Sequence, residues 1–145
     1  MIDPKELRIG NLVQLYRRPV DINKSNHIVT EIFIGLDSCY YIIIEDGFKV
    51  NINKGIEPIS LTSEWLVKFG FNNNQYGINL DAGMFYLDWK GSYLVLADAD
   101  RTVRMKMEDI KYVHQLQNLY FALTQKELKI EDFASHVERD LTNPQ

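Results

Sequence analysis

Hydrophobic and polar residues alternate between residues 1 and 55 in a pattern that predicts a small antiparallel sheet. Strands are predicted at residues 12–16 and 27–36, with a polar loop at 17–26 between them. Two β-rich runs, YYIIIE and FKVNIN, then flank Asp46-Gly47, which favours a tight hairpin because both residues tolerate positive φ. Three consecutive isoleucines in the first run indicate a strand covered on both faces. The region is therefore predicted to form a strongly bent, SH3-like sheet.

Residues 61–71, LTSEWLVKFGF, contain the signals for both ends of a short helix. Thr62 or Ser63 is the predicted N-cap, and Gly70 is the predicted left-handed residue that ends the helix. The apolar residues between these signals share one face at helical spacing. We expect that face to dock on a sheet.

Four more strands and a last helix are predicted in the second half of the chain. The strands are expected at residues 75–80, 84–89, 92–97 and 102–107, and the amphipathic helix within Lys111–Leu128. Strands and helices that come in separate runs, rather than in one-for-one alternation, predict an α+β fold with antiparallel sheets. The expected order is an N-terminal SH3-like bent sheet, a short helix, a second antiparallel meander and a C-terminal amphipathic helix.

The length of 145 residues predicts one compact domain. We expect this domain to span residues 1–128, with lobes of about 1–58 and 59–128. A charged tail or short helix is predicted at 129–145. Hydrophobic residues make up 46% and charged residues 25% of the chain, as is typical of a soluble globular protein.

The charge and cysteine content exclude several classes of function. A net charge of −4 argues against broad nucleic-acid binding, which needs a positive surface over the phosphates. A single cysteine, Cys39, excludes an intrachain disulfide and any zinc site with several cysteines. The start MIDPKELRIGN lacks a basic-then-apolar leader, and no apolar run reaches the length of a membrane span. We therefore expect a cytoplasmic protein that does not bind membranes.

The histidines do not suggest a metal centre. His27, His114 and His136 lie far apart, and none has a second ligand at a spacing typical of metal sites. We therefore predict no metal, no cofactor and no catalytic residue.

One carboxylate pattern leaves an enzymatic alternative open. Asp88-Trp89-Lys90, with Asp81 upstream, has the D-x-K form of many metal-dependent nucleases. In such sites two acids hold Mg²⁺ and the lysine steadies the attacking water. Because Gly91 ends the strand directly after Lys90, a turn is the preferred interpretation.

Four basic residues are candidates for binding an anionic, nucleotide-type small molecule. Arg17 and Arg18 follow Tyr16 in a predicted loop, and Arg104 and Lys106 share one face of a predicted strand. Guanidinium groups near aromatic rings suit phosphate capture. The alternative is a solvated face without a ligand.

The segment KYVHQLQNLYFALTQKEL carries no formal charge from Tyr112 to Gln125. At about 100° per residue, its leucines form one apolar side that is predicted to face the core. The opposite side is uncharged, and its members are His114, Gln117, Asn118, Phe121 and Gln125. Solvated helix faces usually carry Lys and Glu, so this side is predicted to be a partly buried interface with a partner.

Three blocks of sequence, LRIGNLV, PISLTSEWLVKFGF and KYVHQLQNLYFALTQKEL, together resemble a group of uncharacterised small proteins of Bacteroidetes genomes, prophages and phages. The resemblance covers most of residues 5–128, whereas the loop 17–26 and the tail after Lys129 depart from the usual pattern. The resemblance carries no established activity. It implies an accessory protein of a mobile element rather than a housekeeping enzyme, and the cytoplasm expected above would then be that of the bacterial host.

The sequence leaves three functional hypotheses. The first is a non-catalytic binding protein of phage or mobile-element origin that occupies a protein partner, such as a host-defence component, or associates with itself. The second is a binder that sequesters an anionic nucleotide-type molecule with the four basic residues. The third is a metal-dependent nuclease that uses Asp81, Asp88 and Lys90.

Overall fold

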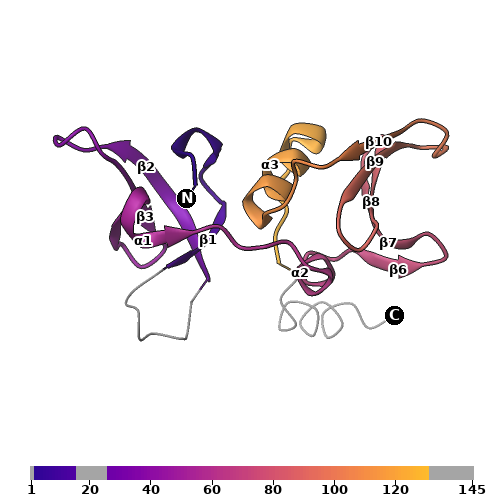
Figure 1. Ribbon diagram of the computed structural model, residues 1–145, viewed down its shortest axis with the longest axis horizontal. Coiled ribbons are helices and arrows are strands. Elements are labelled where there is room, and N and C mark those ends of the chain that lie inside the picture. Colours follow the sequence, from indigo (N-terminus) through magenta and orange to yellow (C-terminus); the bar gives the residue numbers. More distant parts are fainter. Residues whose placement is uncertain (1, 16–25, 131–145) are drawn as a thin grey trace, which may run out of the picture. The chain divides into compact units, whose positions relative to one another are not determined.

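The structure, a computed structural model, describes residues 2–15 and 26–130 of the 145-residue chain (Figure 1). These residues form an α+β fold with two five-stranded antiparallel sheets, which confirms the predicted fold class. Arg17, Arg18 and the predicted tail from residue 131 onward lie outside the described residues.

The chain divides into two compact units. Unit 1 comprises Met1–Leu61 and Asp109–Glu127, and unit 2 comprises Thr62–Glu108 and the chain from Leu128. Each unit contains one of the two sheets.

The sheet of unit 1 has the strand order β4-β3-β2-β1-β5. Its strands are β1 (Leu12–Leu15), β2 (Asn26–Ile34), β3 (Tyr40–Ile44), β4 (Lys49–Asn51) and β5 (Ile56–Glu57). Strand β1 pairs with both β2 and β5, and a one-turn helix, α1 (Ile52–Gly55), separates β4 from β5. A register shift between Val29 and Glu31 interrupts the pairing of β2 with β3 and bends β2. This is the strongly bent, SH3-like arrangement that the sequence predicts.

The β3–β4 hairpin forms at the predicted dipeptide, but its loop is longer than a two-residue turn. The Ile44 N–H donates to the Phe48 carbonyl at 3.1 Å, and the Gly47 N–H donates to the Ile44 carbonyl at 2.9 Å. Gly47 has φ of 89°, whereas Asp46 is not among the residues with positive φ. The loop is therefore residues 45–47, with only its glycine in the left-handed region.

The core of unit 1 fixes which side of β3 faces solvent. Its buried apolar members are Ile2, Leu7, Val13, Leu15, Val29, Ile42, Ile44, Ile52 and Ile56. Since side chains alternate along a strand, Tyr41 and Ile43 lie on the side of β3 opposite Ile42 and Ile44. Both are half-buried.

Helix α3 (Val113–Thr124) begins in contact with the N-terminal half of the chain. The Leu61 N–H donates to the Lys111 carbonyl at 2.9 Å, and the Val113 N–H donates to the Ile59 carbonyl at 2.8 Å. These bonds tie α3 to unit 1. The predicted lobes of about 1–58 and 59–128 therefore differ from the observed units, because this backbone pairing with Ile59 and Leu61 places α3 in unit 1.

A short 3-10 helix, η1 (Pro4–Glu6), precedes β1. The Asp3 carboxylate caps it by accepting from the Lys5 N–H at 3.0 Å. This turn positions residues 6–12, which form the surface on which α3 docks.

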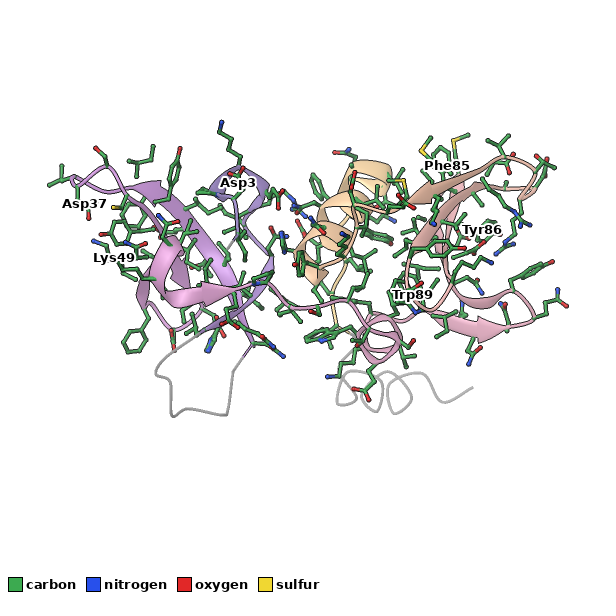
Figure 2. All side chains as sticks on the ribbon, viewed as in Figure 1. Asp3, Asp37, Lys49, Phe85, Tyr86 and Trp89 are labelled. Atoms are coloured by element: carbon green, nitrogen blue, oxygen red, sulfur yellow. The ribbon has the colours of Figure 1, made fainter. Side chains whose placement is uncertain are left out.

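Unit 2 begins with α2 (Ser63–Lys68), whose ends match the sequence signals. The Thr62 hydroxyl accepts from the Trp65 N–H at 3.4 Å, and Gly70 has φ of 88°. The Trp89 indole N–H donates to the Ser63 hydroxyl at 3.1 Å, which links α2 to the sheet (Figure 2).

The sheet of unit 2 is a meander with the order β10-β9-β8-β7-β6. Its strands are β6 (Asn72–Asn74), β7 (Gly77–Ala82), β8 (Phe85–Trp89), β9 (Leu94–Asp98) and β10 (Arg104–Met107). Strand β6 consists of three asparagines, where the sequence analysis predicted no strand. Its pairing with β7 uses backbone groups, so side-chain patterning does not reveal it. Within the described ranges, no helix is long and apolar enough to cross a membrane.

Candidate functional site

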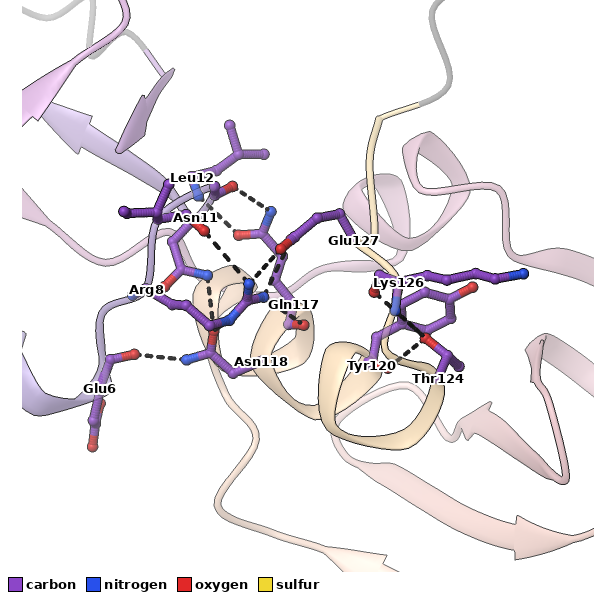
Figure 3. A network of polar contacts seen from close by, with 12 residues as sticks. Glu6, Arg8, Asn11, Leu12, Gln117, Asn118, Tyr120, Thr124, Lys126 and Glu127 are labelled. Carbon is purple, nitrogen blue, oxygen red and sulfur yellow. Dashed lines mark hydrogen bonds and ion pairs between the residues drawn. The ribbon is translucent and has the colours of Figure 1, made fainter. Parts of the chain in front are cut away.

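The uncharged side of α3 lies against residues 6–12 within unit 1 (Figure 3). The Gln117 side-chain N–H donates to the Gly10 carbonyl at 3.2 Å, and its carbonyl oxygen accepts from the Leu12 N–H at 2.8 Å. Gln117 is only 2% exposed. One helix glutamine therefore satisfies both a donor and an acceptor of the buried backbone at the start of β1.

Asn118 extends this contact into a connected network. Its side-chain N–H donates to the Glu6 carbonyl at 2.6 Å. Its carbonyl oxygen accepts from the Asn11 side chain at 2.9 Å and from Arg8 Nε at 3.2 Å. Asn11 is fully buried and accepts in turn from the Arg8 N–H at 2.6 Å. The turn before β1 and the middle of α3 thus share their hydrogen bonds.

The Arg8 guanidinium holds the C-terminal part of α3 and the residues that follow it. Both of its terminal nitrogens pair with the Glu127 carboxylate, and the distance from Nη2 to Oε2 is 3.2 Å. Its carbon atom lies 4.2 Å from the centroid of the Phe121 ring. Gly10 leaves room for this pair, because a Cβ there would lie 3.3 Å from a Glu127 oxygen.

These contacts correct the predicted partner interface on α3. His114 and Gln117 are buried, Asn118 and Phe121 are half-buried against Arg8, and only Gln125 is exposed. The sequence analysis assigned this side of the helix to a partner, whereas the structure commits it to residues 6–12 of the same unit. The physical reason is that the turn before β1 presents backbone groups that need hydrogen-bond partners.

His114 occupies the first turn of α3 and is 1% exposed. Its Nε2 lies 3.4 Å from a Glu6 carboxylate oxygen, and its ring stacks on Tyr112 with centroids 5.9 Å apart. Its Nδ1 is buried without a hydrogen-bond partner. Burial lowers the pKa of His114 and outweighs Glu6, which raises it. Burial therefore favours the neutral form of the imidazole.

The structure describes two of the four predicted anion-binding residues. Arg104 and Lys106 are both exposed on one face of β10. Lys106 Nζ lies 2.9 Å from Glu108, which raises the pKa of the lysine, and 4.3 Å from the Tyr93 ring centroid. Since Arg17 and Arg18 are outside the described residues, the anionic-ligand hypothesis stays a prediction.

A buried ion pair in unit 2 was not predicted from sequence. Arg101 Nε lies 3.3 Å from the Asp88 carboxylate, which is only 2% exposed. The guanidinium carbon lies 4.0 Å from the Tyr76 ring centroid and 4.1 Å from that of Tyr86. Arg101 reaches this position with φ of 57° in the β9–β10 turn.

This ion pair changes the interpretation of the D-x-K pattern. The Asp88 carboxylate is bound by Arg101, Asp81 is exposed, and the Lys90 N–H closes a turn by donating to the Tyr93 carbonyl at 2.9 Å. In the part of the chain that the structure describes, no group of three or more His, Cys, Asp or Glu side chains is placed to hold a metal ion. The turn that the sequence analysis preferred is present at Lys90.

The outward side of the unit 1 sheet carries a stacked pair of rings. Phe33 of β2 and Tyr41 of β3 lie opposite each other in register, with ring centroids 5.7 Å apart and an interplanar angle of 20°. Lys49 of β4 places its Nζ 4.3 Å from the Tyr41 centroid and 5.6 Å from the Phe33 centroid (Figure 2). We call Phe33 and Tyr41 the aromatic pair.

Hydrogen bonds and close packing fix the position of Tyr41. Its hydroxyl donates to one oxygen of Asp37, and the Cys39 N–H donates to the other at 3.1 Å. The hydrogen bond from Tyr41 is the main cause of a lowered pKa of Asp37, and the bond from the Cys39 N–H adds to it. The same contact with Asp37 raises the pKa of Tyr41. A Cβ at Gly35 would lie 2.7 Å from the Tyr41 ring, so the ring rests directly on the glycine backbone. The aromatic pair is therefore preorganised.

Comparison with protein family models, with curated proteins and with solved structures found no match. The functional argument therefore rests on the residues and their geometry.

We predict that Gln117→Leu destabilises unit 1 by about 2–4 kcal/mol, because it leaves the Gly10 carbonyl and the Leu12 N–H buried without this partner. Native-state hydrogen exchange at the β1 and β2 amides measures the loss. Gln75→Leu, in the exposed β6–β7 turn, is the matched control and should change stability by no more than about 0.5 kcal/mol. Equal effects of the two substitutions would contradict the docking role of Gln117.

The neutral His114 predicts a pH dependence of stability. Because its folded-state pKa is below the ordinary value of 6.5, the unfolded chain binds more protons as the pH falls through this value. The contribution of His114 is therefore complete above pH 6.5 and is lost as the pH falls toward the folded pKa. His114→Phe keeps a buried ring that does not titrate, so its free energy of unfolding should fall less than that of wild type under acidification. Urea unfolding followed by circular dichroism at several pH values measures this, and parallel pH profiles would disprove it.

Proposed function

We propose that the chain is a non-catalytic binding protein of a phage or other mobile element, which acts by occupying a protein partner in the cytoplasm of a bacterial host. The resemblance described above supports the origin, and a host-defence component is the class of partner that we propose. The proposed contact surface is the aromatic pair of unit 1 and the apolar Ile43 next to it.

The observation that carries this proposal is the composition of the outward side of β2 and β3. An antiparallel sheet that packs one side on a core normally presents polar residues on the other. Here the outward positions include Phe33, Tyr41 and Ile43, which are half-buried rather than covered. The centres of protein interfaces are enriched in aromatic residues. This composition supports a contact surface better than a solvated one.

Ile43 extends this surface along β3, because it lies two residues from Tyr41 on the same side of the sheet. Ile34 pairs with Tyr40, which packs against the core of unit 1, so Ile34 lies on the opposite side and is not part of this surface. Single exposed apolar residues are ordinary, but preorganised rings with an apolar neighbour on the same side of a sheet are typical of binding sites.

The same surface replaces the side of α3 as the proposed contact. The α3 carboxamides are engaged within unit 1, whereas the aromatic pair faces outward from the core. Contact with a second copy of the chain is an alternative use of this surface, and the experiment below distinguishes it by identifying the captured protein.

We predict that replacing both rings, Phe33→Ala with Tyr41→Ala, lowers partner capture at least about tenfold, because truncation of central aromatic contacts costs more than about 1.4 kcal/mol. Tagged wild type and variant are used to capture proteins from a Bacteroidetes host lysate, and mass spectrometry quantifies each protein recovered. Phe48→Ala, another exposed phenylalanine of unit 1, is the matched control.

The expected result is that Phe48→Ala captures the same proteins as wild type while the double variant loses them, with circular dichroism spectra unchanged. Equal capture by the double variant and wild type would exclude the aromatic pair as the contact. Recovery of untagged copies of the chain alone would assign the surface to self-association.

A further inference from the structure

The aromatic pair already binds a cation, which is supplied by the chain itself. The Lys49 ammonium lies 4.3 Å from the Tyr41 ring centroid, within the distance at which the ring face attracts a positive charge. Lys49 is exposed, so this contact forms at the solvent side of the rings. Such an exposed contact stabilises by only about 0.5–1 kcal/mol, which a competing cation can overcome.

Two carboxylates accompany the aromatic pair. Asp37 accepts a hydrogen bond from the Tyr41 hydroxyl. Glu31 pairs with Ile43, which in turn pairs with Lys49, so all three lie on the outward side of the sheet. Within the described residues, neither carboxylate takes part in an ion pair. The surface therefore offers aromatic faces and two negative charges, with Lys49 as the cation that lies on the rings.

From this arrangement we infer that the partner presents a lysine or arginine side chain, which takes the place of Lys49 on the aromatic pair. The ring faces bind the incoming cation, and Asp37 and Glu31 supply the opposite charge. Lys49 then acts as an internal competitor that lowers the affinity. This inference rests on the proposed function and specifies the chemistry of the partner.

The test is an NMR titration of the isotopically labelled full chain with capped pentapeptides that differ only at the central residue. The four peptides have lysine, arginine, norleucine or proline between pairs of glycines. The lysine and arginine peptides should shift the ring resonances of Phe33 and Tyr41 and release the Lys49 side chain from its ring-shifted position. The norleucine and proline peptides should cause neither change.

Removal of the internal competitor provides a second readout. Lys49→Gln should tighten binding of the lysine and arginine peptides about two- to fivefold, the equivalent of one exposed cation–π contact. Lys54→Gln, which removes an exposed lysine from α1 of the same unit, should leave the affinity unchanged.

The possible results separate this inference from the proposed function. Equal shifts with norleucine or proline would overturn the inference, because binding would then not depend on a cation. If no peptide shifts the rings but partner capture still depends on Phe33 and Tyr41, the inference fails and the proposed function stands. If neither peptide binding nor partner capture depends on the aromatic pair, the inference and the proposed function both fail.

Discussion

The structure of unit 1 depends on backbone groups of residues 6–12 that need hydrogen-bond partners, which the carboxamides of α3 supply. Gln117 donates to one backbone group and accepts from another, and Asn118 does the same toward the backbone of Glu6 and the side chain of Asn11. A lysine could only donate and a glutamate only accept, and either would add the cost of burying a charge. This explains why α3 carries no formal charge along its polar side.

The commitment of α3 changes which surface is available to a partner. An uncharged helix face with a phenylalanine resembles an interface, and it is one, but it lies between elements of a single unit. Arg8 completes it by pairing with Glu127 and covering the Phe121 ring. The surface that remains is the outward side of β2 and β3, where Phe33 and Tyr41 stack beneath Lys49.

Elements with local signals were predictable from sequence, and contacts between distant residues were not. Thr62 and Gly70 mark the ends of α2 because capping is a short-range effect, and period-two patterns located most strands. The docking of Gln117 on Leu12 joins residues 105 positions apart, and no local pattern encodes it. The aromatic pair depends on the register between β2 and β3, and the Asp88–Arg101 pair depends on a left-handed residue in a turn. Assigning alternate residues of β3 to opposite sides of the sheet could have placed Tyr41 on the outward side.

Native-state hydrogen exchange in increasing urea tests most directly whether α3 is an integral part of unit 1. The amides of α3 should open with the same free energy and the same urea dependence as those of β1 and β2, because Gln117 and Asn118 join these elements. Amides of β8 and β9 in unit 2 provide the comparison. Exchange of α3 at a lower free energy than β1, or in step with β8 and β9, would contradict this account.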